Sequence, residues 1–360
     1  TTLAELIFAK DGGNYFAAIK LEQDKDINKI SQFLPANIRR ILDNLSPAQV
    51  NQIEEIRLRK NRPLFLRLFE NEIMLNNSGQ TVQNSLLAYH VTTDDISRTL
   101  HLISQSSLYA LEEEMRNGYL TLPGGHRIGF VGQTVLEGGR VKTIKHISSL
   151  NLRIAKQVLG CAKNIMELLY NHSTLKPYHT LIISPPRCGK TTLLRDIIRE
   201  FSSGFYSKVL GKILHFNVGV VDERSEIAGC YLGVPQNNVG PKTDVLDACP
   251  KAEGMIMLVR SMSPHIIATD EIGREEDVKA IEEILNCGIS VLTTAHGDSI
   301  TELANRPILK QLIQKNVFER YVLLSRTFGP GTIESVLDAK TKHNLLSKPI
   351  YGPRKEMPGC

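Results

Sequence analysis

The chain has 360 residues, of which 42% are hydrophobic and 22% are charged, and it contains no tryptophan. This length and composition are typical of a globular protein with two domains, and they exclude a collagen-like or largely disordered chain. The longest apolar runs have the size of strands, which argues against a membrane-spanning helix, and the first residues do not resemble a signal peptide. The formal net charge of +5 is small, so a dedicated nucleic-acid surface is not favoured.

The six cysteines are scattered along the sequence, and no two of them form a C-x-x-C pair. Neither a zinc site nor a compact disulfide framework is therefore indicated. Scattered thiols in a chain of this length fit a reducing compartment, so we expect a cytoplasmic protein.

The first 155 residues predict an α+β domain. Alternating apolar residues predict strands over 55–59 and 63–68, and two turns rich in glycine predict an antiparallel meander over 118–144. The helices expected from apolar residues at three- and four-residue spacing are 26–34, 35–45, with an interruption at Pro47, and 93–103.

From residue 179 onward, short apolar strands alternate with helical patterns, which predicts a parallel sheet covered on both faces. The strands expected here are 180–183, 213–221, 265–269 and 289–294, and a helix over 276–285 is expected to end at Gly288. We therefore divide the chain into an α+β domain of residues 1–155, a connecting helix and linker of 156–178, an α/β domain of 179–345 and a C-terminal tail of 346–360.

The strongest chemical signal is the segment SPPRCGKTT between the strand at 180–183 and the following helix. A loop in that position presents backbone N–H groups and the positive end of the helix dipole to phosphate oxygens. Lys190 is expected to reach the β- and γ-phosphates of ATP, and the Thr191 hydroxyl to coordinate Mg²⁺. The candidate nucleotide-binding residues are Ser184, Pro185, Pro186, Arg187, Cys188, Gly189, Lys190, Thr191 and Thr192.

Two positions depart from the usual phosphate-loop pattern G-x-x-x-x-G-K-[ST]. Ser184 stands where the first glycine is usual, and Arg187 stands where a small residue is common. Serine fits the opening position if its φ is negative. The alternative is a chance G-K-T sequence before a helix.

The run IIATDE brings two acids to the end of an apolar strand about 80 residues further on. We expect Asp270 to hold a water bound to Mg²⁺ and Glu271 to act as general base on the attacking water. The alternative is a solvated acidic pair at the end of a strand.

Two further strand ends carry polar groups. TTAHG follows the next expected strand, so Thr294 and His296 are placed near the γ-phosphate, although a lone histidine is often structural. The segment 221–226, VDERSE, also ends an apolar strand and contributes Arg224 as a candidate catalytic residue, or it is a solvated loop. Ligands bind at the carboxyl ends of parallel strands, which favours the functional interpretation of both segments.

These four motifs, in this order, resemble the stage III sporulation protein AA family, ATPases related to those of type II and type IV secretion. The segments GCYLGVPQNNVG, AHGDSITELANRP, LSRTFGPGTIESV and PGGHRIGFVG look like that family, and the resemblance covers roughly residues 50–340. It implies a RecA-like ATPase domain behind a smaller N-terminal domain. It also implies a homo-hexamer at the membrane, on the mother-cell side of the forespore septum. There it would energise or assemble the channel to the forespore with membrane proteins of that complex.

Related secretion ATPases use arginines of the N-terminal domain at the γ-phosphate of another subunit or domain. The resemblance places that role on Arg127 and Arg153, and less readily on Arg140. Each of them is equally well explained as an arginine lying over the sheet surface.

Two other functions remain open. A RecA-like ATPase stimulated by single-stranded nucleic acid is one, although the balanced charge and the lack of clustered aromatic residues argue against it. A nucleotide-gated assembly platform with negligible turnover is the other, suggested by Ser184.

Overall fold

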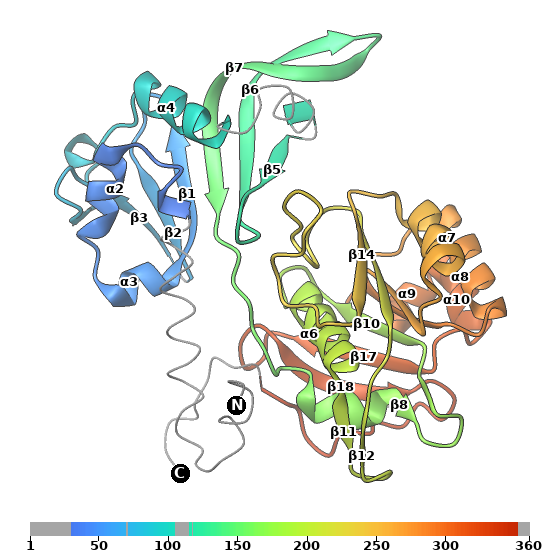
Figure 1. Ribbon diagram of the computed structural model, residues 1–360. Coiled ribbons are helices and arrows are strands. Elements are labelled where there is room, and N and C mark those ends of the chain that lie inside the picture. Colours follow the sequence, from blue (N-terminus) through green and yellow to red (C-terminus); the bar gives the residue numbers. More distant parts are fainter. Residues whose placement is uncertain (1–29, 70, 105–114, 117, 352–360) are drawn as a thin grey trace, which may run out of the picture. The chain divides into compact units, whose positions relative to one another are not determined.

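The computed structural model describes residues 30–69, 71–104, 115–116 and 118–351. The chain divides into two compact units, Thr1–Lys156 and Gln157–Cys360, each with its own hydrophobic core. Figure 1 shows the elements of both units. Within the described ranges, no helix has the length and apolar character needed to span a membrane.

The first unit is built on a seven-stranded antiparallel sheet in the order β4-β3-β2-β1-β7-β6-β5. The two expected strands and the meander are confirmed, and the last strand of the meander continues beyond residue 144. The strands are β1 (Ile53–Arg59), β2 (Phe65–Leu68), β3 (Glu72–Leu75), β4 (Thr81–Val82), β5 (Tyr119–Thr121), β6 (Arg127–Glu137) and β7 (Arg140–Arg153).

Among the described residues of this unit, the helices are α2 (Ala36–Asp43), α3 (Pro47–Gln52), α4 (Thr93–Ile103) and the 3-10 helix η2 (Ser85–Leu87). Helices α2 and α4 confirm two expectations, whereas the helix expected over 26–34 lies largely outside the described residues. The sequence predicts an interruption of the helix at Pro47. In the structure Pro47 is also the first residue of the next helix, α3. Proline suits the first helical position, where its N–H would have no helical partner, and Ser46 caps the helix by accepting from the Gln49 N–H at 3.3 Å.

The second unit contains a seven-stranded sheet in the order β14-β13-β15-β16-β10-β17-β18, parallel except for the last pair. The expected parallel sheet is therefore present. Its strands are β10 (Thr180–Ser184), β13 (Val218–Asp222), β14 (Thr243–Asp247), β15 (Ile266–Thr269), β16 (Ser290–His296), β17 (Arg320–Ser325) and β18 (Thr332–Asp338).

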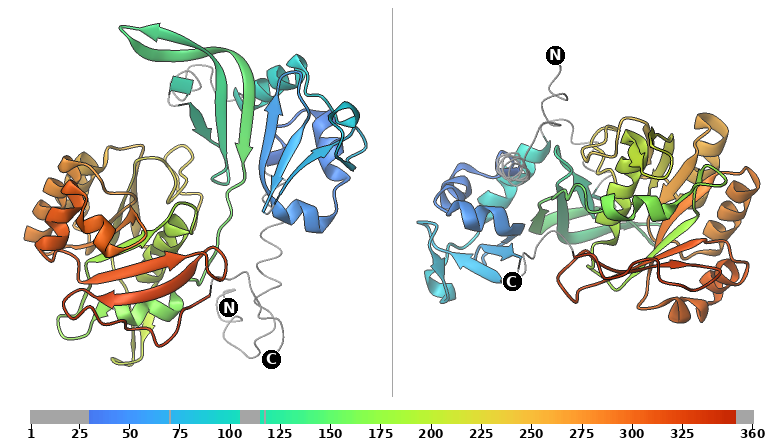
Figure 2. Two further views of the ribbon diagram at one scale, coloured as in Figure 1. Left: turned by 180° about the vertical axis from the view of Figure 1, so that it is seen from behind. Right: turned by 90° about the horizontal axis from the view of Figure 1, so that it is seen from below.

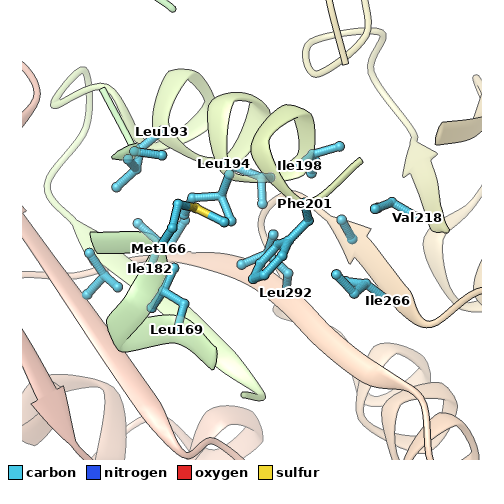
Figure 3. Close-up of a cluster of buried hydrophobic side chains, with 14 of the residues drawn as sticks. Met166, Leu169, Ile182, Leu193, Leu194, Ile198, Phe201, Val218, Ile266 and Leu292 are labelled. Carbon is cyan, nitrogen blue, oxygen red and sulfur yellow. The ribbon is translucent and has the colours of Figure 1, made fainter. Parts of the chain in front are cut away.

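Helices cover both faces of this sheet. Helix α6 (Lys190–Ser203) packs on one face, where Leu194 and Phe201 contact the core formed by β10 and its neighbours (Figure 3). The opposite face is covered by α7 (Lys251–Met262), α8 (Glu275–Asn286), α9 (Ile300–Ala304) and α10 (Pro307–Gln314). Strand β10 serves both cores, because Ile182 faces one layer and its neighbours Leu181 and Ile183 face the other.

Several expectations for this part of the chain are wrong. The strand expected over 213–221 is two strands, because β12 (Lys212–Leu214) pairs with β11 (Phe205–Ser207) in a separate hairpin before β13 begins. The connecting helix expected within residues 156–178 is a 3-10 helix, η4 (Lys163–Leu169), and its apolar side is buried in the core of the second unit.

The polar segment 171–177 is not an open linker. It forms a hairpin between β8 (Tyr170–Asn171) and β9 (Lys176–Pro177), and the Asn171 side chain accepts the N–H groups of the turn residues Ser173 and Thr174. The asparagine side chain accepts the backbone N–H groups of its own turn, and this stabilises a tight hairpin in a segment whose polar composition is typical of a linker.

Strands β17 and β18 form an antiparallel hairpin at one edge of the parallel sheet, drawn in orange-red in Figure 2. The chain then returns along β18, where Ile350 and Ile333 exchange backbone hydrogen bonds of 2.8 and 2.9 Å. The expected C-terminal tail therefore begins later than residue 346, because the segment up to Ile350 belongs to the packed unit.

Candidate functional site

The loop between β10 and α6 has the backbone shape of an anion-binding turn. Gly189 has a φ of +91° and Arg187 a φ of +60°, both in the left-handed region that favours glycine. Helix α6 begins at Lys190, so the unsatisfied N–H groups of its first turn and the positive end of its dipole lie at the loop. A phosphate group is the ligand for which such a helix start is best suited.

Ser184 occupies the opening position of this loop without strain. It is buried, its φ is not positive, and its hydroxyl donates to the Pro185 carbonyl at 2.8 Å. The backbone condition under which serine can replace glycine is therefore met.

Lys190 is only 5% exposed and lies at the centre of a chain of polar contacts. Its Nζ is 2.7 Å from Nδ1 of His296, and Nε2 of the same imidazole is 2.5 Å from a Glu271 carboxylate oxygen. Burial lowers the pKa of Lys190, while the nearby carboxylates of Asp270 and Glu271 act to raise it. The structure thus brings the predicted lysine, histidine and glutamate together.

The second contact chain runs through Asp270. The Thr191 hydroxyl donates to one Asp270 carboxylate oxygen at 2.6 Å, and the Thr294 hydroxyl donates to the other. Strand register explains the meeting: Ser184 pairs with His296 and Thr269 pairs with Thr293, so β10, β15 and β16 end at the same edge.

Oxygen donors of this kind match Mg²⁺, which is commonly held by one or two protein oxygens together with phosphate oxygens and water. Thr191 and Asp270 supply two such oxygens beside the helix start. Among the described residues no group of three or more His, Cys, Asp or Glu side chains could hold a metal on its own. The residues present therefore fit a metal that arrives with a phosphate ligand.

Glu271 adopts an unusual backbone conformation. Its φ is +53°, a region in which a residue other than glycine stores strain, and such strain is typical of functional sites. Several contacts hold it there: its N–H donates to the Thr294 hydroxyl at 3.0 Å, Lys251 donates to its carbonyl at 2.9 Å, and Arg224 donates to its carboxylate at 3.3 Å.

The loop that carries Arg224 is anchored by Asp222, the last residue of β13. The Asp222 carboxylate is 2% exposed and accepts from the backbone N–H groups of Glu226, Ile227 and Ala228 at 2.8–3.1 Å. Burial raises the pKa of this carboxyl, and the three backbone donors act in the opposite direction. Asp222 therefore acts as a positioning residue for the loop.

A small, open hollow lies between this loop and the acids after β15. Its lining residues carry charges of both signs, and they are Asp222, Glu223, Arg224, Glu226, Lys251, Asp270 and Glu271.

The predicted arginines lie in the first unit. Arg127 and Arg153 are directly opposed across β6 and β7, with the Arg127 guanidinium 3.9 Å from the centre of the Tyr119 ring. Arg153 lies 3.6 Å from the Glu55 carboxylate and is 59% exposed. Arg140 begins β7 at the far end of the same hairpin, so it is separated from the other two arginines.

Comparison with known proteins defines the family. A family model described as "Sporulation stage III, protein AA" matches residues 23–344. The chain belongs to this family. It is 46% identical over 322 residues to Stage III sporulation protein AA of Bacillus subtilis, covering 89% of this chain and 98% of that relative. It is also 30% identical to the Arabidopsis thaliana protein SEEDLING PLASTID DEVELOPMENT 1, covering 46% of this chain and 22% of that one.

Among solved structures, the chain is similar to the ATPase DotB of Legionella pneumophila, with a TM-score of 0.51 and 16% identity. The match covers 81% of this chain and 76% of that chain. At this identity the likeness is one of fold. It confirms the expected fold class, a RecA-like α/β domain with a parallel sheet, preceded by a smaller α+β domain with antiparallel strands.

Sequence reasoning missed several residues of the site. Lys251, at the start of α7, lies 2.9 Å from the Glu223 carboxylate, and Arg274 lies 3.5 Å from the same side chain. Arg326 donates to the carbonyl of the loop residue Arg187 at 2.9 Å. No spacing or pattern marks these cations, because each acquires its partner only when distant segments pack together.

Replacing Asp222 with alanine leaves two buried backbone N–H groups and one that is partly buried without their acceptor, so we expect Asp222→Ala to lower the free energy of unfolding by about 1–3 kcal/mol. Chemical denaturation monitored by circular dichroism measures the change. Asp298→Ala, which removes an exposed carboxylate of the same unit, is the matched control and should change stability little. Equal stability of the two variants would show that the Asp222 carboxylate does not hold the loop.

Proposed function

We propose that the protein hydrolyses ATP in a reaction that depends on Mg²⁺ and acts as a secretion-type motor. The observation that carries the proposal is one set of polar contacts at the positive end of α6. It joins Lys190 to His296 and Glu271, and Thr191 to Asp270. Phosphoryl transfer to water requires a phosphate-binding site, a metal-binding site and a carboxylate base beside them.

In this proposal the loop of residues 184–192 binds the phosphates and Lys190 stabilises charge on the β- and γ-phosphates. Lys190 then exchanges its contact with His296 for phosphate oxygens. Thr191 and Asp270 hold Mg²⁺, which neutralises phosphate charge when it is bound. The negative phosphates also favour the charged form of a buried lysine.

Glu271 is the proposed general base, and His296 and Arg224 orient its carboxylate. His296 lies 2.5 Å and Arg224 lies 3.3 Å from different oxygens of that carboxylate. Two donors on one carboxylate fix its direction, and a fixed direction is what a base needs to position an attacking water. His296 contacts both Lys190 and Glu271, so a change in the Lys190 contact on phosphate binding is also transmitted to the Glu271 carboxylate.

The biological role rests on the family. We propose that this motor energises or assembles the channel between mother cell and forespore, as a homo-hexamer on the cytoplasmic side of the membrane. Its proposed partners are membrane proteins of that channel. The 46% identity to Stage III sporulation protein AA over nearly the full length of both chains supports this assignment.

Phosphate release from the purified chain with ATP and Mg²⁺, measured with and without single-stranded DNA, tests the proposal. We expect turnover that is independent of DNA. Stimulation by DNA that is lost at higher salt would instead favour an ATPase acting on nucleic acid. Tight ATP binding without phosphate release would favour a platform that is gated by nucleotide.

Lys190→Ala should lower kcat about 10²–10³-fold, because the variant loses the cation that stabilises charge developing on the phosphates. A coupled phosphate-release assay measures the loss. Lys310→Ala, which removes an exposed lysine on α10, is the matched control and should retain parental turnover. Parental activity of Lys190→Ala would contradict the phosphate-loop assignment.

Glu271→Gln should behave differently, with ATP affinity retained and kcat lowered about 10²–10⁴-fold, because an amide cannot accept the proton of the attacking water. Equilibrium binding with Mg²⁺ and single-turnover hydrolysis separate the two effects. Glu276→Gln, on the exposed side of α8, serves as control. If Glu271→Gln hydrolyses ATP at the parental rate, the base is another residue.

The arginine proposal concerns the paired Arg127 and Arg153. We expect each alanine variant to keep its melting temperature and ATP affinity while turnover falls at least tenfold, equivalent to about 1.4 kcal/mol in the barrier. Lysine should rescue only in part, since an ammonium lacks the planar two-pronged contact. Arg98→Ala, which removes an exposed arginine of α4 in the same unit, is the control. Parental turnover of both alanine variants under conditions that favour the hexamer would refute the idea.

A further inference from the structure

Two aromatic side chains form a pair, and one of them lies on the turn that contacts the phosphate loop. The rings of Phe328 and Tyr351 are 4.6 Å apart between centroids and meet edge to face at 78°. Phe328 is 38% and Tyr351 40% exposed, so both keep ring surface open to solvent. Neither residue takes part in the contacts assigned above to catalysis.

The turn that carries Phe328 is bonded directly to the phosphate loop. It connects β17 to β18 and covers residues 326–331. Arg326 donates to the Arg187 carbonyl and the Gly331 N–H donates to the Cys188 carbonyl, both at 2.9 Å. A side chain on Gly189 would meet the backbone of Gly331 at 3.4 Å, so the two segments are in close backbone contact.

The turn is also held in one shape. Gly329 and Gly331 adopt φ values of +105° and +86°, which other residues rarely reach. The buried Thr332 hydroxyl donates to the Gly329 carbonyl at 2.8 Å, and Tyr351 follows Ile350, which is paired with β18. The aromatic pair is therefore ordered before any ligand arrives, which reduces the entropy lost on binding.

We propose that Phe328 and Tyr351 form the subsite for the base of a nucleoside triphosphate whose phosphates lie on the loop of residues 184–192. This inference rests on the proposed function and adds the place of the base to it. Phe328 is three residues from Gly331, at most about 11 Å along the chain, a span that a ribose and one phosphate can bridge. Exposed aromatic rings bind bases by stacking, and every base offers a π-face.

Stacking alone does not read the hydrogen-bonding edge of a base. The pair therefore distinguishes a nucleoside triphosphate from bare triphosphate, and it accepts ATP and GTP alike. A purely structural role for the pair, as a clasp that fixes the C-terminal segment to β18, makes the opposite prediction. In that case loss of a ring weakens the turn, and through the turn it weakens binding of any phosphate ligand.

The absence of tryptophan from the sequence provides a direct probe. Phe328→Trp introduces a single tryptophan, and we expect ATP and GTP with Mg²⁺ to change its fluorescence while inorganic tripolyphosphate does not. Tyr206→Trp places the same reporter on β11, at a position that is 61% exposed in the parent, and should respond to neither ligand. Equal responses of Phe328→Trp to ATP and tripolyphosphate would overturn the base subsite.

Alanine variants measure the contribution to affinity. Phe328→Ala and Tyr351→Ala should each raise the Kd for ATP about tenfold and leave the Kd for tripolyphosphate unchanged. Equal weakening of both ligands would identify the pair as a structural clasp, and unchanged binding of both would show that no base stacks there. If the parent protein binds neither ATP nor tripolyphosphate, the proposed function itself is overturned. If the parent binds both ligands, the results of the variants test only the base subsite.

Discussion

The arrangement of this site depends on one constraint, the parallel register of β10, β15 and β16. Hydrogen bonding pairs Ser184 with His296 and Thr269 with Thr293. The three strands therefore end at the same edge of the sheet, and the residues at their ends lie together there. Segments that are 80 to 110 residues apart in sequence thereby meet at the N-terminus of α6. A shift of one residue in any of these pairings would turn every side chain of that strand to the opposite face.

Charge compensation is the second requirement at this edge. Lys190 is almost fully buried, and burial of an isolated ammonium group is costly unless partners surround it. The carboxylates of Asp270 and Glu271 and the imidazole of His296 supply those partners in the structure. A ligand with several negative charges could supply the same compensation, which is why the proposed function places phosphate groups beside Lys190.

The outer parts of the site act through backbone contacts. Asp222 holds the loop after β13 through three N–H groups, and Lys251 holds the carbonyl of Glu271. The β17–β18 turn contacts the phosphate loop through Gly331 and Arg326. The Lys251 contact helps to keep Glu271 in its left-handed conformation. The Arg326 and Gly331 contacts connect the turn that carries Phe328 to the loop of residues 184–192.

The sequence by itself determined the parts of the protein that local pattern encodes. The phosphate loop, the acids after an apolar strand and the antiparallel first domain follow from spacing and alternation, which neighbouring residues impose on one another. The break between β12 and β13, the cation Lys251 and the pairing of Phe328 with Tyr351 were decided only by tertiary structure. These features depend on which distant segments pack together, and the spacing of apolar residues within one segment carries no information about that packing.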